Sequence, residues 1–260
     1  MSLDHASKIV KHQTLTRDAF LGGRLIVSQP RNGFRAGMDS VLLGAAVGEK
    51  SQSLLDLGAG PGTAALVALS RNPALSATLA EADPDAAALA AVNLSGNSMD
   101  GRGIVLTVDV TAPGKIRAAA GLPADHFSAV IANPPYYEAG RGTAPSETRA
   151  AARHMHAPDL DRWVKTAATH AAPGGEVIFI YPAHHLPTLL GAFDARFGAI
   201  AILPLSPREG EPATRVLVRG IKGSRAPLTL LATRALHEPG GRAFRPEFDV
   251  IFRGEAGLVW

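Results

Sequence analysis

The sequence predicts an α/β protein in which helices cover both faces of a mostly parallel β-sheet. Three observations support this fold class. Short apolar runs alternate with Ala-rich helical runs between residues 53 and 182, and this alternation is typical of βαβ units. A glycine-rich turn joins the first of these strands to its helix. The sequence Asn-Pro-Pro-Tyr at residues 133–136 follows a later strand, at the carboxyl edge where open α/β sheets bind ligands.

The N-terminal part is predicted to be an extension of a single larger domain. Residues 19–30 read as a short hairpin that turns at Gly22-Gly23, because paired glycines permit a tight turn. The chain shows no internal repeat and no long linker, and its length is sufficient for one sizeable core. We therefore divide it into an extension with a hairpin and a helix, residues 1–48, and a domain formed by residues 49–260.

The elements of that domain follow one another in a regular order. The predicted strands are Ser53–Gly58, Ser76–Asp83, Gly103–Val110, Phe127–Asn133 and Glu176–Pro182. The predicted helices are Thr63–Asn72, Pro84–Asn97, which begins with proline, and Leu160–Gly175, which ends at Pro-Gly-Gly. The C-terminal third is predicted to close the sheet with an antiparallel hairpin made of Thr214–Lys222 and Leu228–Glu238.

Composition excludes several kinds of protein. The chain has no cysteine, so it forms no disulfide, thiol nucleophile or Cys-ligated zinc site. It has no uncharged apolar stretch long enough to cross a bilayer, and the N-terminus lacks the apolar core of a signal peptide. We therefore expect a cytoplasmic protein that does not bind membranes. The spacing of His154, His156 and Asp159 suits no strong zinc pattern, so we expect no metal.

Charge is distributed unevenly along the chain. The net charge is only +3, but basic residues outnumber acids in residues 17–35 and again in residues 208–225. Local basic surface of this kind attracts phosphates. Ordinary solvated arginines give the same pattern, so charge alone does not establish a nucleic-acid partner.

The glycine-rich turn has the composition of a nucleotide-binding loop. Asp56 precedes Gly58, Gly60 and Gly62, and glycines allow positive φ angles and close approach of a ligand to the backbone. The following helix N-terminus offers N–H groups to an anion. The third glycine falls one residue too early for a dinucleotide fingerprint. The spacing D-x-G-x-G-x-G instead resembles motif I of S-adenosylmethionine-dependent methyltransferases, which implies that cofactor.

Acids at the ends of the next two strands are placed to bind a nucleoside. Glu81 closes one strand and is expected to accept hydrogen bonds from both ribose hydroxyls, as an acid does in dinucleotide sites. Asp109 closes the following strand and is expected to accept a hydrogen bond from the adenine amino group. Asp83 competes with Glu81 for the ribose, and the sequence does not choose between them.

Asn133-Pro134-Pro135-Tyr136 resembles the Asp/Asn/Ser-Pro-Pro-aromatic motif of amino methyltransferases. The resemblance implies methylation of a conjugated amine, whose delocalised lone pair makes it a poor nucleophile. The Asn133 side-chain oxygen and the Pro134 carbonyl can accept both amine N–H groups and favour the reactive lone-pair direction. The proline rings of Pro134 and Pro135 fix φ in advance, and Tyr136 offers a ring for stacking. Asn133 is also expected to border the cofactor. Direct in-line transfer needs neither a metal nor a covalent intermediate.

Residues 18–250 as a whole resemble a known family. The similarity is carried by DAFLGGRLIVSQPRNGFRAGMDSVLLGAAV, DLGAGPGTAAL, ANPPYY and TRVLVRGIKGSRAPLTLLATRALHE. These segments resemble the bacterial tRNA(Val) adenine-37 N6-methyltransferases, of the methyltransferase small domain type. The resemblance implies a seven-stranded class I methyltransferase sheet and a tRNA partner. It also implies that Gly37, Met38 and Asp39 lie near the methionine end of the cofactor.

The catalytic sequence leaves other substrates open. Glutamine N5-methyltransferases that act on release factors share it, as do DNA adenine enzymes, and a small-molecule substrate is a further alternative. A cofactor-binding protein without catalysis is disfavoured by the intact Asn133, Pro134 and Tyr136. O-methylation is also disfavoured, because a hydroxyl needs a general base. The sequence leaves the oligomeric state, including a homodimer, open.

An RNA target is expected to be an unpaired base that enters the pocket and stacks on Tyr136. Residues 140–153, which follow the catalytic sequence, are interpreted as a flap over the substrate or as a plain loop. Six arginines are expected to neutralise the flanking phosphates: Arg24, Arg31, Arg35, Arg141, Arg149 and Arg153.

Overall fold

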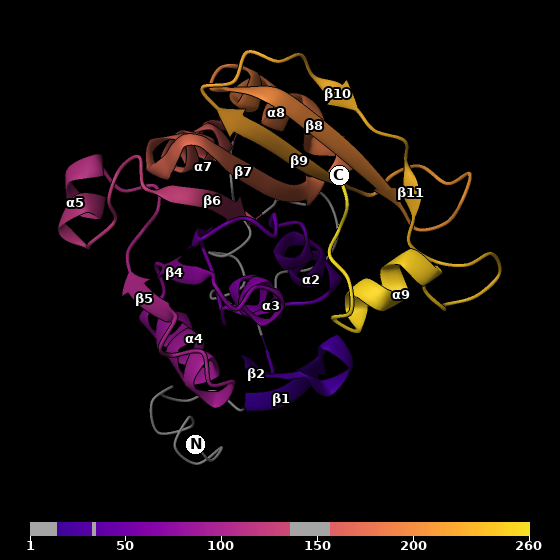
Figure 1. Cartoon of the computed structure of the whole chain (residues 1–260), viewed down its shortest axis with the longest axis horizontal. Coiled ribbons are helices and arrows are strands. Elements are labelled where there is room, and N and C mark those ends of the chain that lie inside the picture. Colours follow the sequence, from indigo (N-terminus) through magenta and orange to yellow (C-terminus); the bar gives the residue numbers. More distant parts are fainter. Residues whose placement is uncertain (1–14, 33–34, 136–156) are drawn as a thin grey trace.

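A central β-sheet runs through the molecule (Figure 1). The computed structural model describes residues 15–32, 35–135 and 157–260. Within these residues the sheet has nine strands, two of which are only two residues long. From one edge to the other the strands are β5 (Gly103–Thr107), β4 (Ser76–Glu81), β3 (Ser53–Leu57), β6 (Phe127–Ala132), β7 (Ala171–Pro182), β9 (Arg215–Lys222), β8 (Phe197–Ser206) and, both beside β8, β10 (Thr229–Leu230) and β11 (Arg234–Ala235).

The direction of the strands confirms the predicted fold class. The first five strands, from β5 to β7, are parallel to one another. The strand β9 runs antiparallel to both β7 and β8. The described chain therefore contains seven longer strands in a mostly parallel sheet with an antiparallel pair at its C-terminal side, the arrangement of a class I methyltransferase.

Helices cover both faces of this sheet because the central strands are apolar on both sides. On β3, Leu54 belongs to one buried cluster, whereas Leu55 and Leu57 belong to the cluster on the opposite face. The first cluster includes residues of α2 (Met38–Ala45), α3 (Thr63–Arg71) and α4 (Pro84–Gly96), and the second those of α7 (Ala157–His170) and α8 (Leu186–Asp194). The short helices are α5 (Gly114–Ala119) and α9 (Pro246–Phe252). Among the described helices, none has the length and apolar character needed to span a membrane.

The predicted N-terminal hairpin is confirmed. Its strands are β1 (Leu15–Phe20) and β2 (Leu25–Pro30), joined by the 3-10 turn η1 (Leu21–Gly23). The buried Asn93 of α4 attaches this hairpin to the rest of the protein. Its side chain accepts a hydrogen bond from Ser28 N and donates to the carbonyls of Ser28 and Pro61, at 2.8, 3.0 and 2.9 Å. One amide thus links the hairpin to the glycine-rich turn.

The predicted partner of β9 is wrong. We expected residues 228–238 to pair with β9 as a hairpin, but they form β10 and β11, which lie parallel to β8. Besides β7, the antiparallel partner of β9 is β8, a strand that we did not predict. Burial explains the difference, because Leu203 and Leu205 of β8 are fully buried while Leu230 is 66% exposed. The strand that covers β9 is therefore the one that gains most from burial.

The boundary between α7 and β7 also differs from the prediction. The helix ends at His170, and residues 171–175 form the start of β7 instead of the last helical turn. A shift in register between Phe127 and Ala129 of β6 accommodates this irregular stretch. Gly175 is required there, since a Cβ atom would lie 2.8 Å from the Phe127 carbonyl oxygen.

The C-terminus holds α2 against the sheet. Leu258 N donates to the Ala45 carbonyl at 2.8 Å, and Trp260 Nε1 donates to the Ala46 carbonyl at 3.1 Å. The Arg219 guanidinium of β9 lies over the Trp260 ring, 4.5 Å from its centroid. The last residues therefore close the gap between the end of α2 and β9.

Removing the Trp260 side chain is expected to destabilise the fold. Trp260→Ala deletes the hydrogen bond to Ala46 and the ring beneath Arg219, so we expect a loss of about 2 kcal/mol in the free energy of unfolding. Trp260→Phe keeps a ring and should lose about half as much. Urea unfolding measures both. Val259→Ala, at an exposed neighbouring position, is the control, and equal midpoints for Val259→Ala and Trp260→Ala would contradict the role of Trp260.

Candidate active site

The carboxyl ends of the parallel strands bring the predicted site residues to one edge of the sheet. Leu57, the last residue of β3, pairs with Ala80 of β4 and with Ala132 of β6. The residues that follow these strands are therefore neighbours. In order along the edge they are the segment of Asp109, then Glu81, then the glycine-rich turn, and then Asn133.

The glycine-rich turn between β3 and α3 depends on its glycines. Gly58, Gly60 and Gly62 have φ angles of 64°, 54° and 84°, which side chains with a Cβ atom rarely adopt. A Cβ at Gly58 would also lie 2.4 Å from Cη2 of Trp163 in α7. The N–H groups of Gly58 and Ala59 both donate to the Ala80 carbonyl, at 2.8 and 3.1 Å. The turn is thus fixed between β4 and Trp163.

Asp56 lies beneath this turn, shielded from solvent. Its side chain accepts a hydrogen bond from Ala65 N in the first turn of α3, at 3.2 Å. Burial raises the pKa of Asp56 from 3.8 to about 7, against the lowering effect of the Ala65 hydrogen bond and with a smaller contribution from the charge of Glu81. Asp56 therefore joins the strand to the helix on either side of the turn.

The carboxylates of Glu81 and Asp83 have different hydrogen-bond partners. The Glu81 carboxylate accepts hydrogen bonds from Gly60 N at 2.8 Å and from Asp83 N at 3.0 Å. It is therefore held directly against the glycine-rich turn. The Asp83 side chain instead caps α4, where it accepts from Asp85 N at 2.8 Å and more weakly from Ala86 N. A capping carboxylate stabilises its helix by satisfying free N–H groups.

Asp109 lies at the far end of the same edge. The backbone of this segment continues along β4, because Val108 N donates to the Glu81 carbonyl at 2.8 Å. One carboxylate oxygen of Asp109 accepts hydrogen bonds from both the backbone N and the hydroxyl of Thr111, at 2.7 and 2.8 Å. The exposed side chain is thereby held in one orientation.

Asn133 follows β6 at the centre of the edge. Asn133 and Pro135 are half-buried, and Pro134 is buried. The phenol of Tyr181, at the end of β7, donates to the Pro135 carbonyl across 3.4 Å. Tyr136 and residues 140–153 lie outside the described residues, as do His154 and His156, so the stacking ring and the flap stay predictions.

The residues expected at the methionine end of the cofactor lie at the start of α2. Asp39 forms an ion pair with Arg215, the first residue of β9, with 2.8 Å between Nε and the carboxylate oxygen. Both side chains are largely shielded from solvent, whereas Met38 is exposed. This ion pair links α2 to the same sheet edge that carries Asn133.

Many basic residues of the two stretches 17–35 and 208–225 have partners within the protein. Arg24 donates to the Gly254 carbonyl, and Arg35 forms an ion pair with Asp18. In the second basic stretch, Arg208 pairs with Glu211 and Lys222 with Asp125, and Arg215 pairs with Asp39 as described above. Arg31 is exposed. Basic composition therefore overstates the free positive charge of these stretches.

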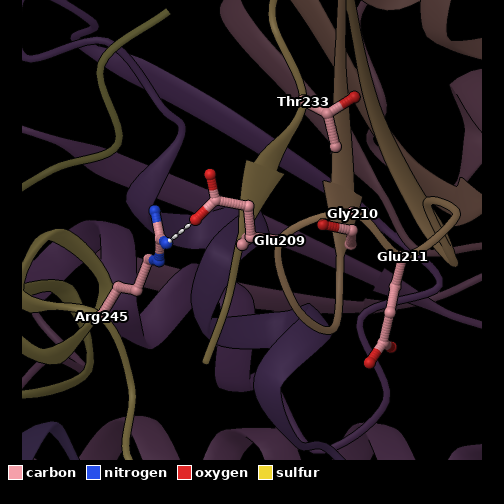
Figure 2. A pocket seen from close by; sticks show the side chains of 7 residues that line it. Glu209, Gly210, Glu211, Thr233 and Arg245 are labelled. Carbon is pink, nitrogen blue, oxygen red and sulfur yellow. Dashed lines mark hydrogen bonds and ion pairs between the residues drawn. The ribbon is translucent and has the colours of Figure 1, made fainter. Parts of the chain in front are cut away.

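A separate cavity of about 310 Å³ opens beyond β8 (Figure 2). Figure 2 shows Arg245 and Glu209 facing each other as an ion pair, while Glu211 points away from them. The cavity is lined by Ser206, Glu209, Gly210, Glu211, Thr233, Ala235 and Arg245. None of these residues belongs to the predicted site. Across the part of the chain that the structure describes, no group of His, Cys, Asp and Glu side chains is arranged to hold a metal ion.

Three residues that contact the site were not predicted from the sequence. They are Trp163, Tyr181 and Arg215. Tyr181 had a usable signal, because it is next to the end of a predicted strand at the carboxyl edge. The positions of Trp163 and Arg215 depend on contacts between distant segments, and the local sequence around them gives no such signal.

Comparison with known proteins identifies the class of enzyme. The family model for the methyltransferase small domain matches residues 37–199. A curated relative from Porphyromonas gingivalis, named tRNA1(Val) (adenine(37)-N6)-methyltransferase, is 29% identical over 66% of this chain and 68% of its own length. A relative of the same name from Citrobacter koseri is 28% identical over 80% of this chain and 89% of its own length.

A solved structure supports the same conclusion. The crystal structure of a predicted O-methyltransferase from Agrobacterium tumefaciens superimposes with a TM-score of 0.72, is 33% identical, and covers 85% of this chain and 98% of its own. The fold and these relatives define an S-adenosylmethionine-dependent methyltransferase. The chain belongs to the methyltransferase small domain family.

The raised pKa of Asp56 predicts how stability depends on pH. Between pH 4 and pH 7 the folded protein keeps a proton on Asp56 that the unfolded chain has released. Raising the pH through this window therefore destabilises the fold, and the full loss is reached above about pH 7. Asp56→Asn removes this titration.

We expect the stability of Asp56→Asn relative to the wild type to increase between pH 4 and pH 7 and then to level off. The gain should be on the order of a few kcal/mol. Urea unfolding across this range, without cofactor, measures it. Asp194→Asn, at an exposed position, is the control. A difference between the wild type and Asp56→Asn that does not change with pH would show that Asp56 is not buried as a protonated acid.

Proposed function

We propose that this enzyme transfers a methyl group from S-adenosylmethionine to N6 of an adenine in tRNA. The observation that carries the proposal is the series of Glu81, the glycine-rich turn and Asn133 along one sheet edge. In this series the carboxylate that would bind the nucleoside and the amide that would bind the amine stand on either side of one turn. The names of the curated relatives supply the substrate. A tRNA substrate also implies that the enzyme works in the cytoplasm.

The residues present fit this cofactor. Glu81 is fixed by two backbone N–H groups, so its remaining lone pairs are oriented before the ribose hydroxyls arrive. Because Asp83 caps α4, we assign the ribose to Glu81. Asp109 would accept from the adenine amine, and Met38 and Asp39 would border the methionine end. Asp56 would act indirectly, by holding the turn in place.

Asn133 and Pro134 would bind the reactive amine. The cofactor supplies an electrophilic methyl group on its sulfonium. The protein's part is to accept the two amine N–H groups with the Asn133 side-chain oxygen and the Pro134 carbonyl. This orientation would direct the nitrogen lone pair toward the methyl group, and the gain would come from alignment before the reaction. The sulfonium–methyl bond would break as the N–methyl bond forms, S-adenosylhomocysteine would leave, and the methylated nitrogen would then release its extra proton to water. Tyr136 would stack on the base.

An RNA substrate must present its base outside a helix, because an exocyclic amine within a stacked duplex cannot reach the sheet edge. We expect an unpaired loop base. The exposed Arg31, together with Arg141, Arg149 and Arg153, is proposed to contact the flanking phosphates. Arg24 and Arg35 would have to share or give up their present partners to do the same.

Other substrates are less well supported. A release-factor glutamine has an amine of the same chemistry, but none of the curated relatives compared above carries that name. The Agrobacterium tumefaciens protein is named a predicted O-methyltransferase. The Asn133 amide and the Pro134 carbonyl accept hydrogen bonds but do not take up a proton, which disfavours a hydroxyl substrate.

Methyl transfer to tRNA tests the proposal directly. Bulk tRNA from a strain that lacks the gene is incubated with the enzyme and labelled S-adenosylmethionine, and the nucleosides are then separated by mass analysis. We expect label in N6-methyladenosine, and tRNA binding that weakens steeply as salt rises, because phosphate contacts release counterions. Label in a protein and not in tRNA would move the assignment to the glutamine enzyme.

Substitutions should separate cofactor binding from chemistry. Glu81→Gln is expected to weaken S-adenosylhomocysteine binding by about tenfold or more, because a charge-assisted acceptor is lost. Asp83→Asn, the matched control, should change this affinity little.

Asn133→Ala is expected to lower turnover by at least about a hundredfold and to leave cofactor affinity nearly unchanged. Calorimetry and steady-state kinetics measure these effects, and full turnover by Asn133→Ala would rule out the assigned role.

A further inference from the structure

The two prolines after Asn133 leave one backbone angle of the catalytic turn undetermined. A proline ring locks its own φ but not its ψ. The ψ angle of Pro134 is restricted because the next residue is also a proline, whereas Tyr136 places no such restriction on Pro135. The ψ angle of Pro135 decides where its carbonyl points and in which direction the chain continues toward the proposed stacking residue. Some other contact must therefore set this angle before the substrate binds.

Tyr181 makes that contact among the described residues. It lies next to the last residue of β7, and β7 is the neighbour of β6 in the sheet. The Tyr181 side chain is buried, and its hydroxyl donates to the Pro135 carbonyl across 3.4 Å. A hydrogen bond of this length is weak, but contacts at active sites often shorten when the substrate complex forms.

The surroundings of Tyr181 hold its ring in place. The imidazole of His185, in the turn η2 (Ala183–His185), lies at a tilt to the phenol with 5.7 Å between ring centroids. The backbone of Tyr181 is also held, because this residue pairs with Val216 of β9 in the sheet. Because strand and ring are both held, the hydroxyl is presented to Pro135 by rigid structure.

We propose that Tyr181 is a positioning residue that orients the Pro135 carbonyl, and through it the catalytic turn, for methyl transfer. The inference rests on the proposed function, since it assigns Tyr181 a part in the reaction at that site. Tyr181 acts through the turn and does not itself take up the amine proton. Its hydroxyl restrains the ψ angle of Pro135, which the two proline rings do not fix.

Nuclear magnetic resonance tests the contact without a substrate. The chain contains a single Pro-Tyr peptide, Pro135-Tyr136, so protein labelled with carbonyl-¹³C proline and ¹⁵N tyrosine gives one carbonyl–amide cross peak. Tyr181→Phe keeps the ring and removes the hydroxyl, and it should shift this peak. Ser206→Ala removes another buried hydroxyl that donates to a backbone carbonyl at the same sheet edge and should leave the peak unchanged. An unchanged peak in Tyr181→Phe overturns the inference.

Kinetics then tests the functional part. We expect Tyr181→Phe to lower kcat on tRNA about five- to tenfold, as for one lost hydrogen bond. The KM for S-adenosylmethionine should not change. The control Ser206→Ala should keep the kcat of the wild type. In an Asn133→Ala background, Tyr181→Phe should lower kcat on tRNA little further, because the turn has already lost its function. If Tyr181→Phe lowers kcat by the same factor in the wild type and in Asn133→Ala, the positioning role is overturned. A wild type that methylates no tRNA refutes the proposed function instead, while the cross peak still reports on the contact.

Discussion

The site depends on the hydrogen bonds that fasten the glycine-rich turn to the end of β4. Gly58 and Ala59 donate to the Ala80 carbonyl, and Gly60 donates to the Glu81 carboxylate. These bonds make the turn and the Glu81 carboxylate one rigid unit. The glycines are needed because all three have φ angles that other residues rarely adopt, and because a Cβ atom at Gly58 would collide with Trp163.

Around this unit the sheet sets the spacing of the site residues. Neighbouring strands lie about 4.8 Å apart, so residues that follow adjacent strands are spaced evenly along the edge. The acid that ends β4 and the amide that follows β6 stand on either side of the turn after β3. The carboxylates of Glu81 and Asp109 therefore lie on one side of the turn, and the neutral amide of Asn133 lies on the other.

The parts that were predicted correctly are those with local signals. The segment from β3 to α4 agrees with the prediction to within two residues, because periodicity, the N-terminal proline of α4 and the glycines all act within short windows. The strand β8 was missed although it directly precedes β9 in the chain, and its pairing with β9 buries apolar residues on both of its faces. The Arg215–Asp39 ion pair joins residues 176 positions apart, so no local pattern could reveal it.

The same distinction explains how the catalytic turn is made rigid. Its local part, the two proline rings, is visible in the sequence because it consists of consecutive residues. Its non-local part is the Tyr181 contact, which exists only because β7 lies beside β6. Local rigidity limits φ, and the neighbouring strand has to supply the remaining restraint on ψ. Under the proposed function this turn has to hold two acceptors still for an amine, and its place between two fixed neighbouring strands suits that task.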